Sequence, residues 1–190
     1  MKKILQKEEE VLHQVAKEIP LDEIKTPKIQ KILKEMSDSL KSQDDGVAIA
    51  APQIGYSLRI FVVSGKIFEE DFLENRKERM DGEKETKEVI KVKQKIKDLV
   101  FINPKISKLS KDKEWMPEGC LSVRPIYGKT YRSKKATVEA YDETGKKFIR
   151  GGSNLLAQIF QHETDHLEGI LFIDHAKDLR EEEIPGYEKE

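Results

Sequence analysis

The sequence predicts an α+β fold in which mixed or antiparallel sheets pack around a central helix. Short apolar runs typical of strands occur along the chain without a regular alternation of strand and helix. Two longer segments instead show the three- and four-residue spacing of apolar side chains that is typical of amphipathic helices. A length of 190 residues is sufficient for one domain with a substantial core.

The composition favours a soluble globular protein with a heavily charged surface. Charged and hydrophobic residues each make up 37% of the chain, and the net charge is −1. This balance gives no basis for a nucleic-acid partner, and no apolar segment approaches the length of a membrane span. The single cysteine, Cys120, excludes an internal disulfide, and no export signal opens the chain, so we expect a cytoplasmic protein.

The first predicted element is a helix over about 27–42. Thr26 suits its N-cap and Pro27 its first position, and apolar residues then recur at helical spacing at 29, 32, 33, 36 and 40. A run of small and apolar residues follows from 47 to 55, and residues 59–63 are typical of a buried strand.

Residues 66–98 are predicted to form a charged insertion. Twenty of these 33 residues are Lys, Arg, Asp or Glu, and no steady apolar periodicity precedes Val89. We expect a solvated helical excursion or a long hairpin between core strands.

Three further strands are predicted after the insertion. The first covers 99–102 and is expected to stop at Asn103-Pro104, whereas the other two cover 136–142 and 147–149 and join through a turn at 143–145. Glycines at 151 and 152 are expected to break the sheet.

A second helix is predicted over about 154–168, with Ser153 as its N-cap and Gly169 as its C-terminal cap. An apolar strand or packed segment follows at 170–173. We expect a domain over residues 1–176 and a charged, loosely ordered tail over 177–190.

The second helix carries the pattern His162-Glu163-Thr164-Asp165-His166. Residues four apart lie on one helical face, so two imidazoles at this spacing can bind one metal ion. The histidines continue an apolar stripe through Leu155 and Ile159, which indicates that they point inward. Glu163 is placed to take a proton from metal-bound water. Two buried core histidines without a metal would be the structural alternative.

The residues leave two sources for a third ligand. A third histidine six positions after His166 is excluded, because Phe172 stands there. A carboxylate could come from Glu181, Glu182 or Glu183, as in a metallopeptidase that cuts internal bonds. Cys120 could instead supply a thiolate and leave a position for water, although a lone cysteine is often only a small buried hydrophobe.

Three motifs together resemble the peptide deformylase family. Residues 46–53 read Gly-Val-Ala-Ile-Ala-Ala-Pro-Gln, residues 118–122 read Glu-Gly-Cys-Leu-Ser, and residues 161–166 read Gln-His-Glu-Thr-Asp-His. All three occur in the family's order, and the resemblance covers about residues 1–176.

The resemblance implies a role for each matching residue. Cys120, His162 and His166 would hold a divalent metal, ferrous iron natively and zinc or nickel in some preparations. Glu163 would act as general base and then as general acid. The amide of Gln53 and the backbone N–H of Leu121 would stabilise the oxyanion at the formyl carbon.

The implied substrate is the N-formyl group of methionine on nascent peptides, a partner that would also bring a transient ribosome contact. The peptide would pair along residues 46–48 and 118–119, which are Gly46, Val47, Ala48, Glu118 and Gly119. The methionine pocket would be lined by Val47, Leu155, Gln158, Ile159 and His162.

The chain departs from the family pattern at three positions. Ala48 replaces a glycine, Arg124 stands where a proline is common, and Gln158 replaces an apolar residue. These changes bear on rate and side-chain preference, whereas the ligands, the base and the oxyanion donors are intact. A loose match also places Tyr131 and Arg132 near the substrate, and Asp165 is interpreted as a partner of the metal ligands. A non-catalytic relative that only binds peptide or metal is the remaining alternative.

Overall fold

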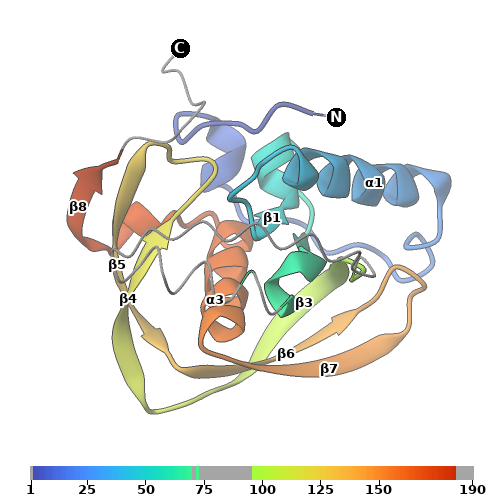
Figure 1. The fold of residues 1–190 in the computed structure, drawn as a ribbon. Helices are drawn as coiled ribbons and strands as arrows, with labels where there is room; N and C mark the ends of the chain where they lie inside the picture. Colours follow the sequence, from blue (N-terminus) through green and yellow to red (C-terminus); the bar gives the residue numbers. More distant parts are fainter. Residues whose placement is uncertain (1, 70–71, 73–95, 183–190) are drawn as a thin grey trace.

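The computed structural model describes residues 2–69, 72 and 96–182. Their helices and strands form an α+β architecture with two antiparallel sheets, as predicted. One sheet has the strand order β1-β2-β3-β6-β7, and the other has the order β4-β5-β8. Helix α3 lies between the two sheets, while α1 packs on the far side of the larger sheet (Figure 1).

The larger sheet consists of β1 (Ala48–Ala50), β2 (Ile60–Val63), β3 (Leu99–Leu109), β6 (Lys135–Tyr141) and β7 (Lys147–Ser153). The smaller sheet consists of β4 (Lys113–Gly119), β5 (Ile126–Ser133) and β8 (Lys177–Glu181). The α-helices of the described ranges are α1 (Pro27–Lys41) and α3 (Leu155–Leu167). Short 3-10 turns cover Glu10–His13, Ala51–Ile54, Gly65–Phe68 and Phe172–Asp174.

Strand β2 shows why an unbroken apolar run is needed at the centre of this fold. Phe61 and Val63 belong to the cluster that includes Phe160 of α3, whereas Ile60 and Val62 belong to the cluster that includes the inner face of α1. Because successive strand residues point to opposite faces, a strand covered on both faces must be apolar throughout. The two helices therefore bury both sides of this part of the sheet.

Helix α1 confirms the prediction made from its capping residues. It begins at Pro27, and the Thr26 hydroxyl accepts the backbone N–H of Ile29 at 3.5 Å. Its buried positions include Ile29, Ile32, Leu33, Met36 and Leu40, which are the residues that recur at helical spacing.

Strand β3 does not stop at Asn103-Pro104, so that prediction is wrong. The strand continues to Leu109, with a shift of register against β6 between Ile102 and Lys105. Asn103 takes a positive φ of 49°, and its side chain bonds both the N–H and the carbonyl of Ile19 at 2.8 Å. The strand continues past this irregularity, and the Asn103 side chain ties it to the backbone of Ile19.

The glycines at 151 and 152 also lie within a strand, contrary to prediction. They pair with Thr137 and Ala136 inside β7, which runs to Ser153. A Cβ at Gly152 would lie 2.8 Å from the side chain of Leu156, so this glycine lets α3 pack onto the sheet. Ser153 is therefore a strand residue, and Asn154, with φ 51°, precedes the helix instead.

The C-terminal end of α3 agrees with the prediction, because Gly169 has φ +74° and donates its N–H to the carbonyl of His166. The charged segment that follows was expected to be loosely ordered. Its described part forms β8, which pairs with β5 through Ile126, Tyr127 and Lys129. Most of the predicted insertion, residues 70–71 and 73–95, lies outside the described residues.

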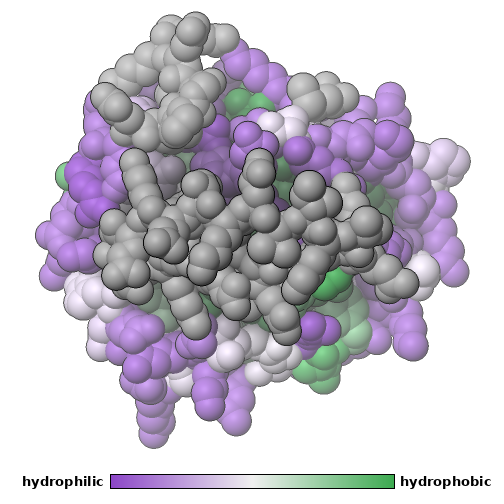
Figure 2. Space-filling view, viewed as in Figure 1, coloured by the Kyte–Doolittle hydropathy of each residue, from purple (hydrophilic) through white to green (hydrophobic). Residues whose placement is uncertain are grey.

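The face seen in Figure 2 is largely hydrophilic where its residues are described, with small hydrophobic areas between charged side chains. No helix of the described ranges combines the length and the apolar character that crossing a membrane requires.

Candidate metal centre

The centre is formed where α3 meets the end of β4. His162 and His166 lie one turn apart on α3, and Cys120 directly follows β4. One ligand atom from each of these residues lies within 4.8 Å of the others, and Cys120 Sγ is 3.2 Å from His166 Nε2. Ligands at the usual distances from a tetrahedral ion are separated by about 3.3–3.8 Å. The chain therefore brings together three soft or borderline donors at metal-binding separations.

His162 is oriented by Glu118, the residue two before Cys120. The Nδ1 atom of His162 lies 2.7 Å from Glu118 Oε1, which leaves Nε2 as the nitrogen available to a metal. Burial favours a raised pKa for Glu118, but the neighbouring His162 and Arg132 hold that pKa well below its usual range. An ionised carboxylate is thus kept against the outer nitrogen of this histidine.

Glu118 is itself held by three side-chain donors. Arg132 binds it through two bonds, Nη2 to Oε1 at 2.7 Å and Nε to Oε2 at 3.1 Å. Thr130 donates to Oε2 at 2.5 Å, and Gln158 donates to the same atom at 3.2 Å. Because all four residues are buried, the carboxylate has little freedom to move.

Arg132 was expected near the substrate, but the structure places it behind Glu118. Its Nη1 atom also binds Asp165 Oδ2 at 2.6 Å. Asp165 thus reaches His162 through Arg132 and Glu118, which agrees with its interpretation as a partner of the metal ligands. The sequence pattern alone could not reveal this chain of contacts, because it joins β4, β5 and α3.

Glu163 lies beside the ligands and is 3% exposed. Burial raises its pKa to about 7, and its Oε2 atom has no hydrogen-bond partner among the described residues. A carboxyl group with such a pKa can both accept and donate a proton near neutrality.

Burial lowers the pKa of His166 well below its ordinary value, which favours the neutral ring that binds metals.

Gln53 reaches the centre from the 3-10 turn that follows β1. Its Oε1 atom accepts the N–H of Ala50 at 2.8 Å, so the amide nitrogen points the other way. That nitrogen lies 3.0 Å from Ser122 Oγ and 3.5 Å from Cys120 Sγ. An amide N–H donor is therefore presented beside the thiol.

The centre opens into a pocket of about 600 Å³. All the site residues predicted from sequence line it except His166, which is 1% exposed. The lining includes Gly46, Val47, Ala48, Gln53, Glu118, Gly119, Cys120, Leu121, Leu155, Gln158, Ile159, His162 and Glu163. Segments far apart in the sequence thus converge around one cavity.

The outer part of this pocket contains residues that sequence reasoning did not assign to the site. They are Asp44, Asp45, Arg124, Tyr127, Arg180 and Glu182, together with others. Arg124 was noticed only as a departure from the family pattern. Arg180 was missed, and Glu182 was considered only as an alternative metal ligand, because their segment was expected to be a loose tail.

The alternative carboxylate ligands that the structure describes, Glu181 and Glu182, do not join the centre. Glu181 ends β8 and Glu182 follows it, and neither is part of the ligand cluster. Glu183 lies outside the described residues.

Gln158, expected in the methionine pocket, lines the cavity but also donates to the carbonyl of Pro117 at 2.8 Å.

The donor set fits a divalent metal ion. A thiol and two imidazoles suit zinc, ferrous iron or nickel, and the outer nitrogen of His162 is already bound by a carboxylate. Glu163 Oε2 is buried without a partner among the described residues, as expected of a polar atom that faces a further group.

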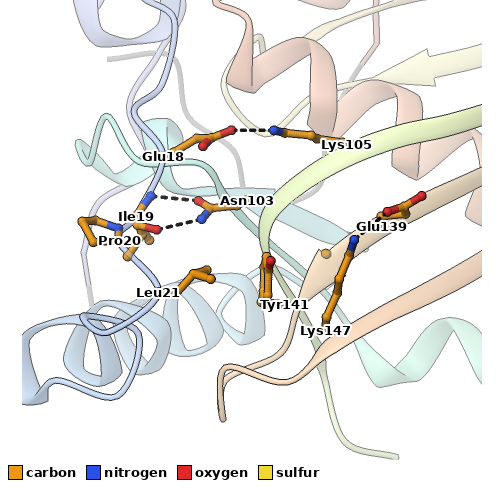
Figure 3. Close-up of a pocket in the computed structure, with 10 residues that line it drawn as sticks. Glu18, Ile19, Pro20, Leu21, Asn103, Lys105, Glu139, Tyr141 and Lys147 are labelled. Carbon is orange, nitrogen blue, oxygen red and sulfur yellow. Dashed lines mark hydrogen bonds and ion pairs between the residues drawn. The ribbon is translucent and has the colours of Figure 1, made fainter.

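Another pocket, of about 490 Å³, lies between β3, β6 and the N-terminal segment (Figure 3). Two ion pairs flank it, Glu18 with Lys105 and Glu139 with Lys147, each at 3.0 Å. Asn103 is occupied by the backbone of Ile19. These charges are balanced in pairs, and none of the residues that line this pocket belongs to the metal centre.

Comparison with known protein families gives one clear match. The family model described as polypeptide deformylase matches residues 1–182. Peptide deformylase 2 of Clostridium acetobutylicum is 36% identical over 174 residues, covering 92% of this chain and 94% of its own. A peptide deformylase of Fusobacterium nucleatum is 36% identical over 186 residues, covering 96% and 90%.

Solved structures give the same result. A peptide deformylase from Legionella pneumophila superposes with a TM-score of 0.72 at 31% identity, covering 94% of this chain and 87% of its own. A peptide deformylase from Synechococcus elongatus, solved in complex with actinonin, superposes with a TM-score of 0.68 at 28% identity, covering 92% and 78%.

Proposed function

Because the chain belongs to the polypeptide deformylase family, we propose that Cys120, His162 and His166 hold its metal ion and that Glu163 transfers the proton of its reaction. The activity is removal of the N-formyl group from the N-terminal methionine of nascent proteins, with release of formate. The observation that carries the assignment of residues is the buried Cys-His-His cluster with a carboxyl group beside it.

A divalent ion bound by the three ligands would act as a Lewis acid that acidifies water and polarises the formyl carbonyl. Its proposed identity in the cell is ferrous iron, with zinc or nickel as substitutes in purified preparations. The soft thiolate and the two imidazoles accept all three metals, so the ligands support this choice without determining it.

Glu163 is proposed to accept the proton of the attacking water and then to deliver it to the leaving amine. Its support is a pKa of about 7 that results from burial, together with the unpartnered Oε2 atom. A general base and acid works best when its pKa lies near the working pH.

Gln53 and Leu121 are proposed to stabilise the negative charge that develops on the formyl oxygen. The amide nitrogen of Gln53 lies within 3.5 Å of Cys120 Sγ, which supports a donor directed toward the centre. Leu121 directly follows Cys120, so its backbone N–H lies one peptide unit from the ligand. Donors fixed before the reaction need no reorganisation in the transition state.

The nascent peptide is proposed to lie in extended form between residues 46–48 and residues 118–119. All five of these residues line the pocket, and an added strand gains affinity from main-chain hydrogen bonds. Leu155, Gln158 and Ile159 on α3 would receive the methionine side chain, together with Val47 and His162. We also propose a cytoplasmic location and transient encounters with the ribosome, where this substrate is produced.

The test uses the iron-loaded protein, purified without oxygen, and formyl-Met peptides as substrates. We expect stoichiometric formate release by the native chain and a loss of at least about 100-fold in Glu163→Ala, since general catalysis contributes this much. The variant should retain its iron, as measured by metal analysis. Absence of formate release with iron fully bound would contradict the assignment.

Glu163→Gln provides the matched control, because it keeps the volume of the side chain and removes only its proton-accepting oxygen. A comparable activity in Glu163→Gln and the native protein would show that another group transfers the proton.

A further inference from the structure

The pocket at the metal centre, called the groove below, is lined by two segments that are distant in sequence. We define the first rim as residues 43–48, between α1 and β1, and the second rim as residues 117–124, from the end of β4 through the turn that holds Cys120. The rims approach each other closely at Gly46, because a Cβ added there would lie 3.3 Å from Leu121 Cδ1. A peptide between them must fit both rims at once, so their separation controls binding.

Arg124 joins the two rims at the mouth of the groove. Its Nη1 atom donates to Gln43 Oε1 at 2.9 Å, and its Nη2 atom forms an ion pair with Asp45 Oδ1. The Arg124 side chain is 12% exposed, so this contact is partly shielded from water. A planar guanidinium bound to two side chains of one loop fixes both the distance and the angle between the rims.

The first rim is anchored independently on its other side. The Lys66 ammonium donates to the carbonyl of Asp44 at 2.9 Å and to that of Gln43 at 3.5 Å. This lysine belongs to the 3-10 turn Gly65–Phe68, which extends from the larger sheet through β2. The first rim is therefore tied to the larger sheet by Lys66 and to the second rim by Arg124.

The second rim is supported by Tyr127. Its ring packs against Gly119 so closely that a Cβ there would lie 2.4 Å from the ring. Burial raises the pKa of Tyr127, and the nearby charges of Asp45 and Glu182 act in the same direction while Arg124 opposes them. These charges place the tyrosine in the same cluster as the Arg124 contact.

We propose that Arg124 is a positioning residue that clasps Gln43 and Asp45 and sets the rim separation at which an extended peptide binds. This inference rests on the proposed function, because it assumes that the peptide lies between the rims. Gln43 and Asp45, which Arg124 binds, belong to the first rim and not to the metal ligands, so we expect its effect on peptide binding and not on the formyl chemistry.

The first experiment compares two substrates in Arg124→Ala. For formyl-Met-Ala-Ala, which extends along both rims, we expect KM to rise five- to tenfold while kcat stays within twofold. For formyl-Met alone, kcat/KM should change less than twofold. Arg124→Lys should recover only part of the loss, because an ammonium cannot reproduce the fork that binds two partners.

A second experiment measures binding without turnover. The deformylated product Met-Ala-Ala is titrated into the metal-loaded protein by calorimetry, and its Kd should rise five- to tenfold in Arg124→Ala. The reversed pair, Asp45→Arg with Arg124→Asp, should bind the peptide within about threefold of the native protein, whereas either reversal alone should bind it worse. If Arg124→Ala does not fold, Asp45→Ala can replace it, because it removes the same ion pair by changing the more exposed partner.

Lys147→Ala is the control, because it breaks a cation–carboxylate pair, with Glu139, at the remote pocket of Figure 3. Its KM and its Kd for the product should match the native values. The proposed role of Arg124 would be contradicted if Arg124→Ala lowered kcat/KM equally for both substrates, or if it left the Kd for Met-Ala-Ala unchanged. Failure of the proposed function would give a different result, because the native chain would then release no formate. The titration with Met-Ala-Ala would still show whether Arg124 affects peptide binding.

Discussion

At the scale of single residues, the metal centre is built from donors whose partners are also fixed. The sequence identifies His162, Glu163 and His166 through their spacing, and it identifies Cys120 through a motif. It does not identify Arg132 and Thr130, which hold Glu118 in place behind His162. Side chains of this kind carry no local signature, because their role exists only once β5 lies beside β4.

Arg132→Met is expected to destabilise the protein by about 3–5 kcal/mol, because removing one partner leaves the buried carboxylate of Glu118 unpaired. Metal affinity should also fall roughly 10–100-fold, since the orientation of His162 depends on Glu118. Urea unfolding and metal competition with a chelator measure the two effects.

Lys134→Met is the control for this change. Lys134 follows the same strand, but its ion pairs with Asp112 and Glu114 lie at the surface. A loss of stability in Arg132→Met that is no larger than in Lys134→Met would contradict the role given to Arg132.

At the scale of elements, glycines decide how closely strands and helices approach the centre. The strands β4 and β5 pair from Lys113 with Ser133 to Gly119 with Tyr127, and this last pair lies at the pocket. The sequence places Gly119 in a motif beside Cys120. It does not reveal that the ring of Tyr127 leaves no room for a side chain at this position. It also predicts that Gly151 and Gly152 break the sheet, because glycine weakens isolated strands. The packing of α3 against β7 overrides that preference.

Gly119→Ala is expected to reduce stability by about 1–3 kcal/mol, because the new methyl group would overlap the ring of Tyr127 and overpack the site. The same change should weaken binding of the product peptide. Thermal unfolding with metal bound and calorimetry measure these effects.

Gly151→Ala is the matched control, since nothing lies within 4 Å of the position where its Cβ would be. It should leave stability unchanged or slightly raised. The double variant Gly119→Ala with Tyr127→Ala should lose less stability than the two single changes together. Additive losses would show that the ring is not what requires the glycine.

At the scale of the whole molecule, the metal centre joins the two sheets. Cys120 follows β4 of the smaller sheet, whereas α3, which carries both histidines, packs against β6, β7 and β1 of the larger one. Figure 1 shows the helix between them. An ion bound by all three ligands therefore adds a further link between layers that are already joined by contacts such as Arg132 with Asp165 and Gln158 with the carbonyl of Pro117.

Metal binding should stabilise the whole fold in proportion to its affinity, because the unfolded chain does not present the three ligands together. At a metal concentration about 1,000-fold above Kd, the gain is roughly 4 kcal/mol. Removal of the metal by a chelator should lower Tm accordingly, as scanning calorimetry would measure.

Cys120→Ala tests whether the thiol is part of this link. The variant should lose most of the dependence of Tm on added zinc. If its Tm rises with zinc as much as in the native chain, Cys120 is not a ligand, and a carboxylate must take its place.

The sequence by itself determined the fold class, helix α1, the central strand β2 and the pattern of two histidines with a glutamate. These features follow from local periodicity and capping, which depend on neighbours within a few residues. Only the tertiary structure decided the bend at Asn103, the strands β4, β5 and β8, and the contacts of Arg124 and Arg132. Most of those features join residues that are far apart in the sequence, and a polar strand or a buried ion pair is stable only when another part of the chain supplies its bonds.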